Sequence, residues 1–151
     1  MKSQRQTIYL VVAGLLRRDD ELLLVSQKAS EDERAYWALP GGVVAPGEAL
    51  TMALAREVGE EAGLEVTDPG RLAFVAQTPG CVTFTFEVGE WAGEVRPRDP
   101  DGFVTDAQLF PVQEAIAKLA ELPSPSMRDP AVAYLRGTLK PGAVWMERDR
   151  T

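Results

Sequence analysis

Residues 42–64, GVVAPGEALTMALAREVGEEAGL, contain a predicted helix that runs from Glu48 to Ala62. Gly63 follows at the position where a left-handed residue commonly ends a helix, which supports this boundary. Small and mostly apolar residues recur at spacings of four, three and four, and they form the stripe Thr51, Ala55, Val58 and Ala62. A helix with such a stripe is suited to lie against a sheet.

Three carboxylates share one side of this helix. Glu57, Glu60 and Glu61 stand at positions i, i+3 and i+4, within an arc of about 100°. Like charges this close destabilise a helix by roughly a few tenths of a kcal/mol per pair, and Arg56 supplies one compensating charge. An isolated acidic helix face is normally just solvated. Here it follows the pair Gly41–Gly42, whose backbone can approach a ligand closely, so we expect a hard divalent cation such as Mg²⁺ among the carboxylates.

The composition restricts the chemistry of the chain. Its 151 residues include no histidine and a single cysteine, Cys81. This excludes catalytic pairs that need histidine, zinc sites with histidine ligands, disulfides within the chain and multi-cysteine metal sites. With 16 Lys and Arg against 23 Asp and Glu, the net charge of −7 argues against a nucleic acid polymer as partner. Acid–base and metal chemistry then fall mainly to carboxylates.

The length corresponds to one domain, and strands and helices are intermixed along it. The predicted strands are residues 7–17, 22–26, 37–39, 71–77, 82–88 and 103–110. Besides residues 48–62, the predicted helices are residues 111–122 and a segment that begins at Asp129–Pro130 and ends near residue 137. The first two strands are expected to form a hairpin, and residues 40–42 to break regular structure. This order predicts a mixed α/β sandwich.

The segment from Gly42 to Leu64 resembles the signature of the Nudix (MutT-like) hydrolases, G-x5-E-x7-R-E-U-x-E-E-x-G-U with U aliphatic, at every fixed position. Chance agreement is on the order of one in a billion per starting position. Residues 37–42, 7–26 and 99–115 also look like the segments that flank the signature in this family. The resemblance implies one Nudix domain over residues 1–151, of α/β class, with a Nudix-type α/β/α sandwich, a mixed β-sheet and a loop-helix-loop catalytic motif.

The resemblance also implies an activity and the residues that carry it. Members of the family hydrolyse a diphosphate linked to another group, typically a nucleoside diphosphate derivative, with Mg²⁺ or Mn²⁺ as cofactor. The implied metal ligands in this sequence are Glu57, Glu60, Glu61 and the carbonyl of Gly42. The implied catalytic set is Glu48, Arg56, Glu60 and Glu61. In this set Glu48 and Arg56 orient the ligands or help to bind the metal.

A carboxylate is expected to take the proton from the attacking water. Glu61 or Glu60 is the first expectation for this base. In some family members an acid in a later loop assists, and the candidates here are Asp99, Asp101 and Glu94. An ordinary turn at residues 99–102 is the simpler interpretation of that segment.

The resemblance leaves the substrate open among nucleoside triphosphates, ADP-ribose or nucleotide sugars, and dinucleoside polyphosphates. Pro79 lies 15 residues beyond Leu64, where a proline resembles the ADP-ribose and nucleotide-sugar subgroup, although a proline before glycine is commonly just a turn. The compact length is more similar to enzymes of the other two groups. The alternative function is a non-catalytic sensor of a nucleotide derivative. A sensor would be free to lose its acids, and this chain keeps them.

The expected partner is therefore a small molecule, with no membrane and no nucleic acid polymer. The apolar run Ile8–Leu16 follows Lys2 and Arg5 and loosely imitates a signal peptide. It is far shorter than the ~20 residues that span a bilayer, so we expect a buried strand and a cytoplasmic protein. Members of the family often form homodimers, but no interface is apparent in this sequence.

Overall fold

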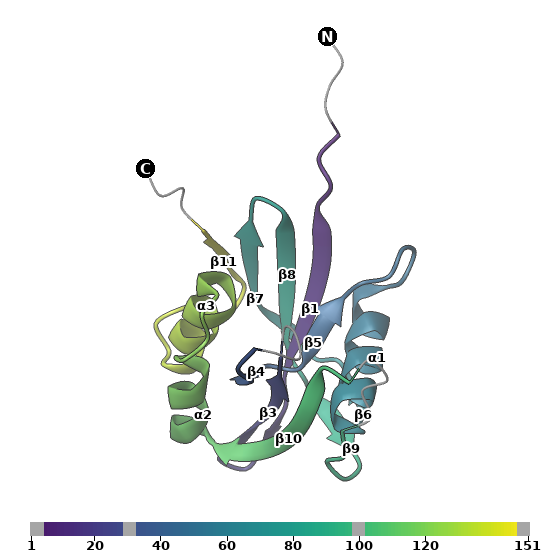
Figure 1. The fold of residues 1–151 in the computed structure, drawn as a ribbon, viewed down its shortest axis with the longest axis vertical. Helices are drawn as coiled ribbons and strands as arrows, with labels where there is room; N and C mark the ends of the chain where they lie inside the picture. The colour runs from purple at the N-terminus through teal and green to yellow at the C-terminus, as the bar shows by residue number, and fades with distance from the viewer. Residues whose placement is uncertain (1–4, 29–32, 98–101, 148–151) are drawn as a thin grey trace.

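The computed structural model describes residues 5–28, 33–97 and 102–147, and its chain forms three layers. One helix covers one face of the central strands and two helices cover the other (Figure 1). The helices are α1 (Leu50–Ala62), α2 (Val112–Leu119) and α3 (Pro125–Leu135). The strands are β1 (Tyr9–Leu15), β2 (Arg17–Arg18), β3 (Glu21–Gln27), β4 (Tyr36–Ala38), β5 (Gly41–Val43), β6 (Glu65–Asp68), β7 (Arg71–Thr78), β8 (Cys81–Glu87), β9 (Glu90–Ala92), β10 (Val104–Pro111) and β11 (Ala143–Met146). The predicted α/β class is confirmed.

The strands form two main sheets and a short ribbon. The larger sheet has the order β11-β7-β8-β1-β5, the second has the order β10-β3-β2 with β4 also paired to β3, and β6 pairs with β9. The β1–β8 and β11–β7 pairs are parallel, while the other pairs are antiparallel. The predicted mixed sheet is thus present.

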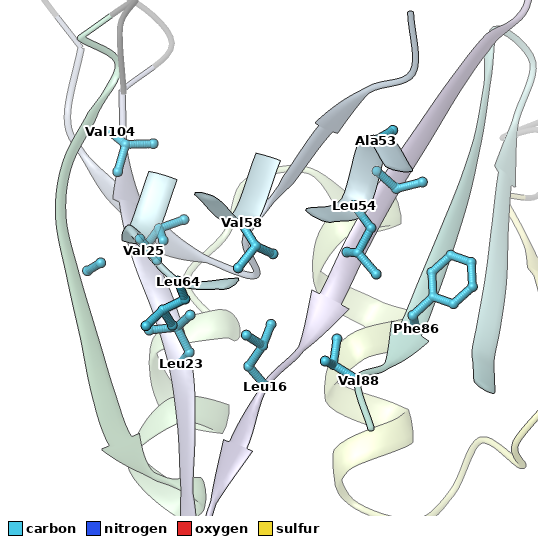
Figure 2. Close-up of a cluster of buried hydrophobic side chains, with 13 residues drawn as sticks. Leu16, Leu23, Val25, Ala53, Leu54, Val58, Leu64, Phe86, Val88 and Val104 are labelled. Carbon is cyan, nitrogen blue, oxygen red and sulfur yellow. The ribbon is translucent and has the colours of Figure 1, made fainter. Parts of the chain in front are cut away.

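Helix α1 packs on one face through a cluster of buried apolar side chains (Figure 2). Leu54, Val58 and Ala62 are fully buried in it, whereas Thr51 is exposed and Ala55 is half-buried. The predicted stripe is therefore correct at Val58 and Ala62 and wrong at its first half. Leucine buries more apolar area than threonine or alanine, and the spacing of four from Leu54 to Val58 to Ala62 sets the buried face.

Helices α2 and α3 cover a second cluster on the opposite face. Leu15 belongs to this cluster and the adjacent Leu16 to the first one, and both are fully buried. Successive residues of a strand point to opposite faces, so a continuous apolar run is required where both faces are covered. The run at residues 8–16 therefore contains strand β1, but the expectation of a buried strand holds only for its second half, since Ile8, Tyr9 and Leu10 are exposed. Within the described residues, no helix is long and apolar enough to cross a membrane.

The expected hairpin of residues 7–17 and 22–26 is mostly wrong. β1 pairs with β5 and β8 in the larger sheet, and only Arg17–Arg18 pairs with β3 in the second sheet. The chain changes sheets at Leu16, whose carbonyl still accepts a hydrogen bond from the amide of Leu23 at 3.0 Å. The turn at residues 19–20 therefore closes the pairing of Arg17–Arg18 with β3, in which Arg17 is the only residue of the expected first strand.

Two other expectations are corrected near prolines. Residues 41–43 form strand β5, although the sequence predicted that residues 40–42 break regular structure. Helix α3 begins at Pro125 and not at Asp129–Pro130, which leaves Pro130 buried inside the helix. Ser124 and Pro125 give an earlier start, because the amides of residues 127 and 128 already donate to the Ser124 carbonyl at 3.2 and 3.0 Å. The short strands β6, β9 and β11 were not predicted at all.

Candidate active site

Strand β5 is in close contact with β1 at Gly41 and with α1 at Gly42, and the absence of side chains at both glycines allows this. A Cβ on Gly41 would lie 2.1 Å from the Val12 carbonyl oxygen, and one on Gly42 would lie 2.5 Å from the Glu57 carboxylate carbon. Real Cβ atoms do not come so near to other atoms, so only glycine fits at either position without rearrangement. The glycine pair therefore brings the β5 backbone into direct contact with the acidic side of α1.

Arg56 gathers three carboxylates on that side of α1. Its Nε and Nη2 donate to the two oxygens of Glu48 at 2.9 and 3.0 Å, and Nη1 donates to Glu57 at 2.9 Å. The same Nη1 lies 3.5 Å from Glu60. A further bond of 3.2 Å joins Nη2 to the Val43 carbonyl of β5. Among the described residues, one guanidinium thus contacts three carboxylates beside Gly42.

Glu48 is fixed from two directions before α1 begins. Besides Arg56, the amide of Ala45 donates to its Oε1 at 3.0 Å. The hydrogen bond from Arg56 is the largest cause that lowers the pKa of Glu48, followed by the Ala45 bond, and together they hold it at about 2. The bond to Glu48 is also the main cause that raises the pKa of Arg56 above its usual value. The pair therefore remains charged throughout the ordinary pH range.

We expect the stabilising effect of this pair to depend on pH. The pKa of Glu48 falls from 4.5 to about 2 on folding, so its contribution is complete above about pH 4.5 and disappears as the pH falls towards 2. Urea unfolding of wild type and Glu48→Gln between pH 2.5 and pH 6 measures this. The difference between their midpoints should shrink steadily as the pH falls. A difference that stays constant over this range would contradict the assignment.

Glu61 is held separately from the Arg56 cluster. It is only 4% exposed, its Oε1 accepts the Gly41 amide at 2.8 Å, and its Oε2 accepts the Gln27 Nε2 at 3.1 Å. The three predicted carboxylates stay on one arc of α1, yet Glu57 and Glu60 turn to Arg56 while Glu61 turns to β5 and β3. A buried carboxylate is stable only with such hydrogen bonds.

The donor set matches a hard divalent cation in its chemistry. Mg²⁺ and Mn²⁺ prefer carboxylate and carbonyl oxygens, which are the groups that α1 and β5 bring together. In the described part of the chain, however, no three Asp, Glu, His or Cys side chains are already arranged to hold a metal ion. Glu57 and Glu60 face a guanidinium in this arrangement. The residue types fit such a cation, and their present contacts are those of an ion-pair cluster.

A cavity of about 300 Å³ adjoins the same strand. Strands β1, β5, β7 and β8 form one wall, and the segment from Leu122 to Ala131 forms another. The lining residues that the structure describes are all neutral, and the polar ones among them are Gln27, Cys81, Thr83, Thr85, Ser124 and Ser126. Gly41 and Gly42 border this cavity and also contact the acids of α1. No local pattern marks these residues as the lining of one cavity, because they come from six separate segments.

Of the three candidate acids that follow α1 in the sequence, only Glu94 belongs to the described structure. Asp99 and Asp101 lie outside the described residues. Glu94 is described, with its side chain 83% exposed and paired with Arg96 at 3.3 Å. Its neighbour Arg96 donates its amide to the Ala62 carbonyl at the end of α1, at 2.6 Å. This segment therefore passes the carboxyl end of the acidic helix.

Cys81, the single cysteine of the sequence, is the first residue of β8. It is half-buried and borders the cavity. Its Sγ lies 3.7 Å from the Thr83 hydroxyl. It belongs to the cavity wall.

Comparison with known proteins agrees with this site. A family model described as the NUDIX domain matches residues 8–129. A putative 8-oxo-dGTP diphosphatase 2 of Mycobacterium tuberculosis is 38% identical over 109 residues, which cover 68% of this chain and 77% of the relative. The 8-oxo-dGDP phosphatase NUDT18 of Homo sapiens is 38% identical over 86 residues, 57% of this chain. That match spans only about a quarter of the human protein (26%).

A solved structure shows the same architecture. The NUDIX hydrolase from Nitrosomonas europaea superposes with a TM-score of 0.73 at 28% identity, covering 89% of this chain and 93% of the other. The family match covers most of the chain and includes the glycine pair, the Arg56 cluster and Glu61. The chain therefore belongs to the Nudix hydrolase family.

Proposed function

We propose that this chain is a divalent-metal-dependent pyrophosphohydrolase that cleaves the diphosphate linkage of a nucleoside diphosphate derivative. The observation that carries this proposal is the Arg56 cluster, where one guanidinium faces Glu48, Glu57 and Glu60 beside the Gly42 backbone. Carboxylates gathered in this way suit a cation that is shared with substrate phosphates.

The roles of individual residues follow from their contacts. Glu57, Glu60, Glu61 and the Gly42 carbonyl would hold Mg²⁺ or Mn²⁺, which neutralises phosphate charge and lowers the pKa of a bound water. Arg56 and Glu48 orient the acids, since Arg56 contacts Glu57 and Glu60 directly and is itself fixed by Glu48. Glu60 is more exposed than Glu61 and is the better candidate for the base that takes the proton from water.

The neutral cavity would hold the nucleoside part of the substrate. It borders Gly41 and Gly42, so a nucleoside there would place its phosphates next to the acids of α1. A relative is named for 8-oxo-dGTP and another for 8-oxo-dGDP. We therefore propose a purine nucleoside di- or triphosphate as the substrate class, with nucleotide sugars and dinucleoside polyphosphates as the groups to be tested against it.

A substrate panel tests the proposal. Wild type would be incubated with dGTP, 8-oxo-dGTP, 8-oxo-dGDP, CTP, ADP-ribose and a dinucleoside tetraphosphate, with Mg²⁺, with Mn²⁺ and with EDTA. Release of phosphate or pyrophosphate from a purine nucleotide with metal, and none with EDTA, is expected. Tight nucleotide binding without turnover of any compound would instead support the sensor function. Equal rates with EDTA would contradict the metal requirement.

A further inference from the structure

Gln27 lies between the neutral cavity and the buried carboxylate of Glu61. Its Nε2 donates to Glu61 Oε2 at 3.1 Å, and its side chain also lines the cavity. The other carboxylate oxygen accepts the Gly41 amide at 2.8 Å. Each oxygen of Glu61 is therefore fixed by a donor from a different strand, Gln27 from β3 and Gly41 from β5.

The backbone of Gln27 is well placed for a positioning role. It is the last residue of β3, and it pairs with Val104 of β10 on one side and with Tyr36 of β4 on the other. The next amide, of Lys28, donates to the Phe103 carbonyl at 3.1 Å. A residue paired on both sides has little backbone freedom, so the sheet fixes the direction in which the Gln27 side chain leaves the strand.

The cavity is coupled to Glu61 through these two donors. Within the described part of its lining no side chain is charged, and two of these residues, Gln27 and Gly41, donate to Glu61. A carboxylate held at both oxygens by neutral donors has a defined plane. Loss of the Gln27 donor removes one of the contacts that define this plane, the one to Oε2.

We propose that Gln27 is a positioning residue that fixes the plane of the Glu61 carboxylate and links it to occupancy of the cavity. The kinetic part of this inference rests on the function proposed above, whereas the structural part does not. A nucleoside that contacts the carboxamide of Gln27 acts on Glu61 without touching it. Mutation of a residue that hydrogen-bonds to a catalytic or metal-binding carboxylate typically lowers activity by about 10–100-fold.

The first test needs no metal and no turnover. Amide ¹H–¹⁵N spectra of the EDTA-treated full chain would follow the Gly41 resonance in wild type, Gln27→Met and Gln77→Met. Methionine keeps the length of glutamine without its donor, and Gln77 is an exposed residue of β7, which makes its variant the matched control. The Gly41 resonance should move in Gln27→Met only. Addition of dGMP should shift it in wild type and in the control, and several-fold less in Gln27→Met.

A Gly41 resonance that is unchanged in Gln27→Met would overturn the positioning role, and no response to dGMP in wild type would overturn the link to the cavity. If Gln27→Met does not fold, Gln27→Asn replaces it. Its carboxamide is one methylene too short to keep the bond to Glu61, so the same displacement of the Gly41 resonance is expected.

The second test is kinetic. Gln27→Met should lower kcat by about 10–100-fold and change KM by less than about threefold, while Gln77→Met matches wild type. A change in KM alone would show that Gln27 contributes to substrate binding in the cavity and does not position Glu61. If wild type hydrolyses no compound, the proposed function fails, and the Gly41 spectra still decide the inference about Gln27.

Discussion

Glu60→Gln is expected to lower kcat by about a thousandfold while leaving the free energy of unfolding unchanged. The side chain is about one-third exposed, and its contact with Arg56 at 3.5 Å is long, so the amide fits without structural cost. A glutamine cannot accept the proton of an attacking water or supply a charged ligand, and removal of a general base typically costs 10²–10⁴-fold, on the order of this estimate. Steady-state kinetics and urea unfolding on the same preparation measure both effects.

Glu61→Gln is the informative comparison. It should lower kcat to a similar extent, but it should also lower the free energy of unfolding by about 1–3 kcal/mol, because its NH₂ group would face a donor at Gln27 or Gly41. Glu65→Gln is the matched control, since this exposed residue lies just beyond the helix. Full activity in Glu60→Gln would remove Glu60 from the catalytic set, and an unchanged stability of Glu61→Gln would contradict the buried contacts.

Gly41→Ala should produce the largest loss of stability. The new Cβ would lie 2.1 Å from the Val12 carbonyl oxygen and 2.8 Å from the Ala13 Cα, and neither of these backbone atoms can yield as a side chain can. Strand β5 would have to separate from β1, which also breaks the Gly41 bond to Glu61. We expect a loss of about 3 kcal/mol in the free energy of unfolding, at the upper end for overpacking, together with loss of activity.

Gly80→Ala is the control for this experiment. A Cβ on Gly80 has nothing within 4 Å, and its φ is not in the left-handed region. The change should therefore leave the urea midpoint close to that of wild type. If Gly41→Ala and Gly80→Ala unfold at the same urea concentration, the close approach of β5 to β1 is not the reason for the glycine.

Local patterns predicted much of the fold. The strand predicted at residues 82–88 matches β8 to within one residue at each end, although burial does not alternate along it, since Thr85 is as buried as its neighbour Phe86. Gly63 ends α1 as predicted, with φ of 70°. The acids Glu57 and Glu60 were grouped correctly by helical spacing alone, since neighbours on a helix are fixed by its geometry.

Such local patterns could not predict the contacts between segments that are distant in the sequence. Nothing local indicated that Gln27 and Gly41 would hold Glu61, because this depends on the pairing of β3 and β5 with the rest of the sheets. The short strands β6 and β9 pair over only a few residues and are separated from each other in the sequence. Neither therefore has a strong pattern of its own. The glycine pair was predicted to break structure, whereas its lack of side chains is what allows β5 to pair closely with β1.

Direct titration with Mn²⁺ tests the central claim, that the acids of α1 hold a divalent cation for hydrolysis. Free Mn²⁺ would be followed by electron paramagnetic resonance in wild type, in Glu57→Gln/Glu60→Gln and in Glu65→Gln. Saturable binding is predicted in wild type and in Glu65→Gln, and it should weaken by at least tenfold in the double variant, in parallel with the loss of activity. Equal Mn²⁺ binding by all three proteins, or hydrolysis by wild type that persists after the metal is removed, would contradict the account.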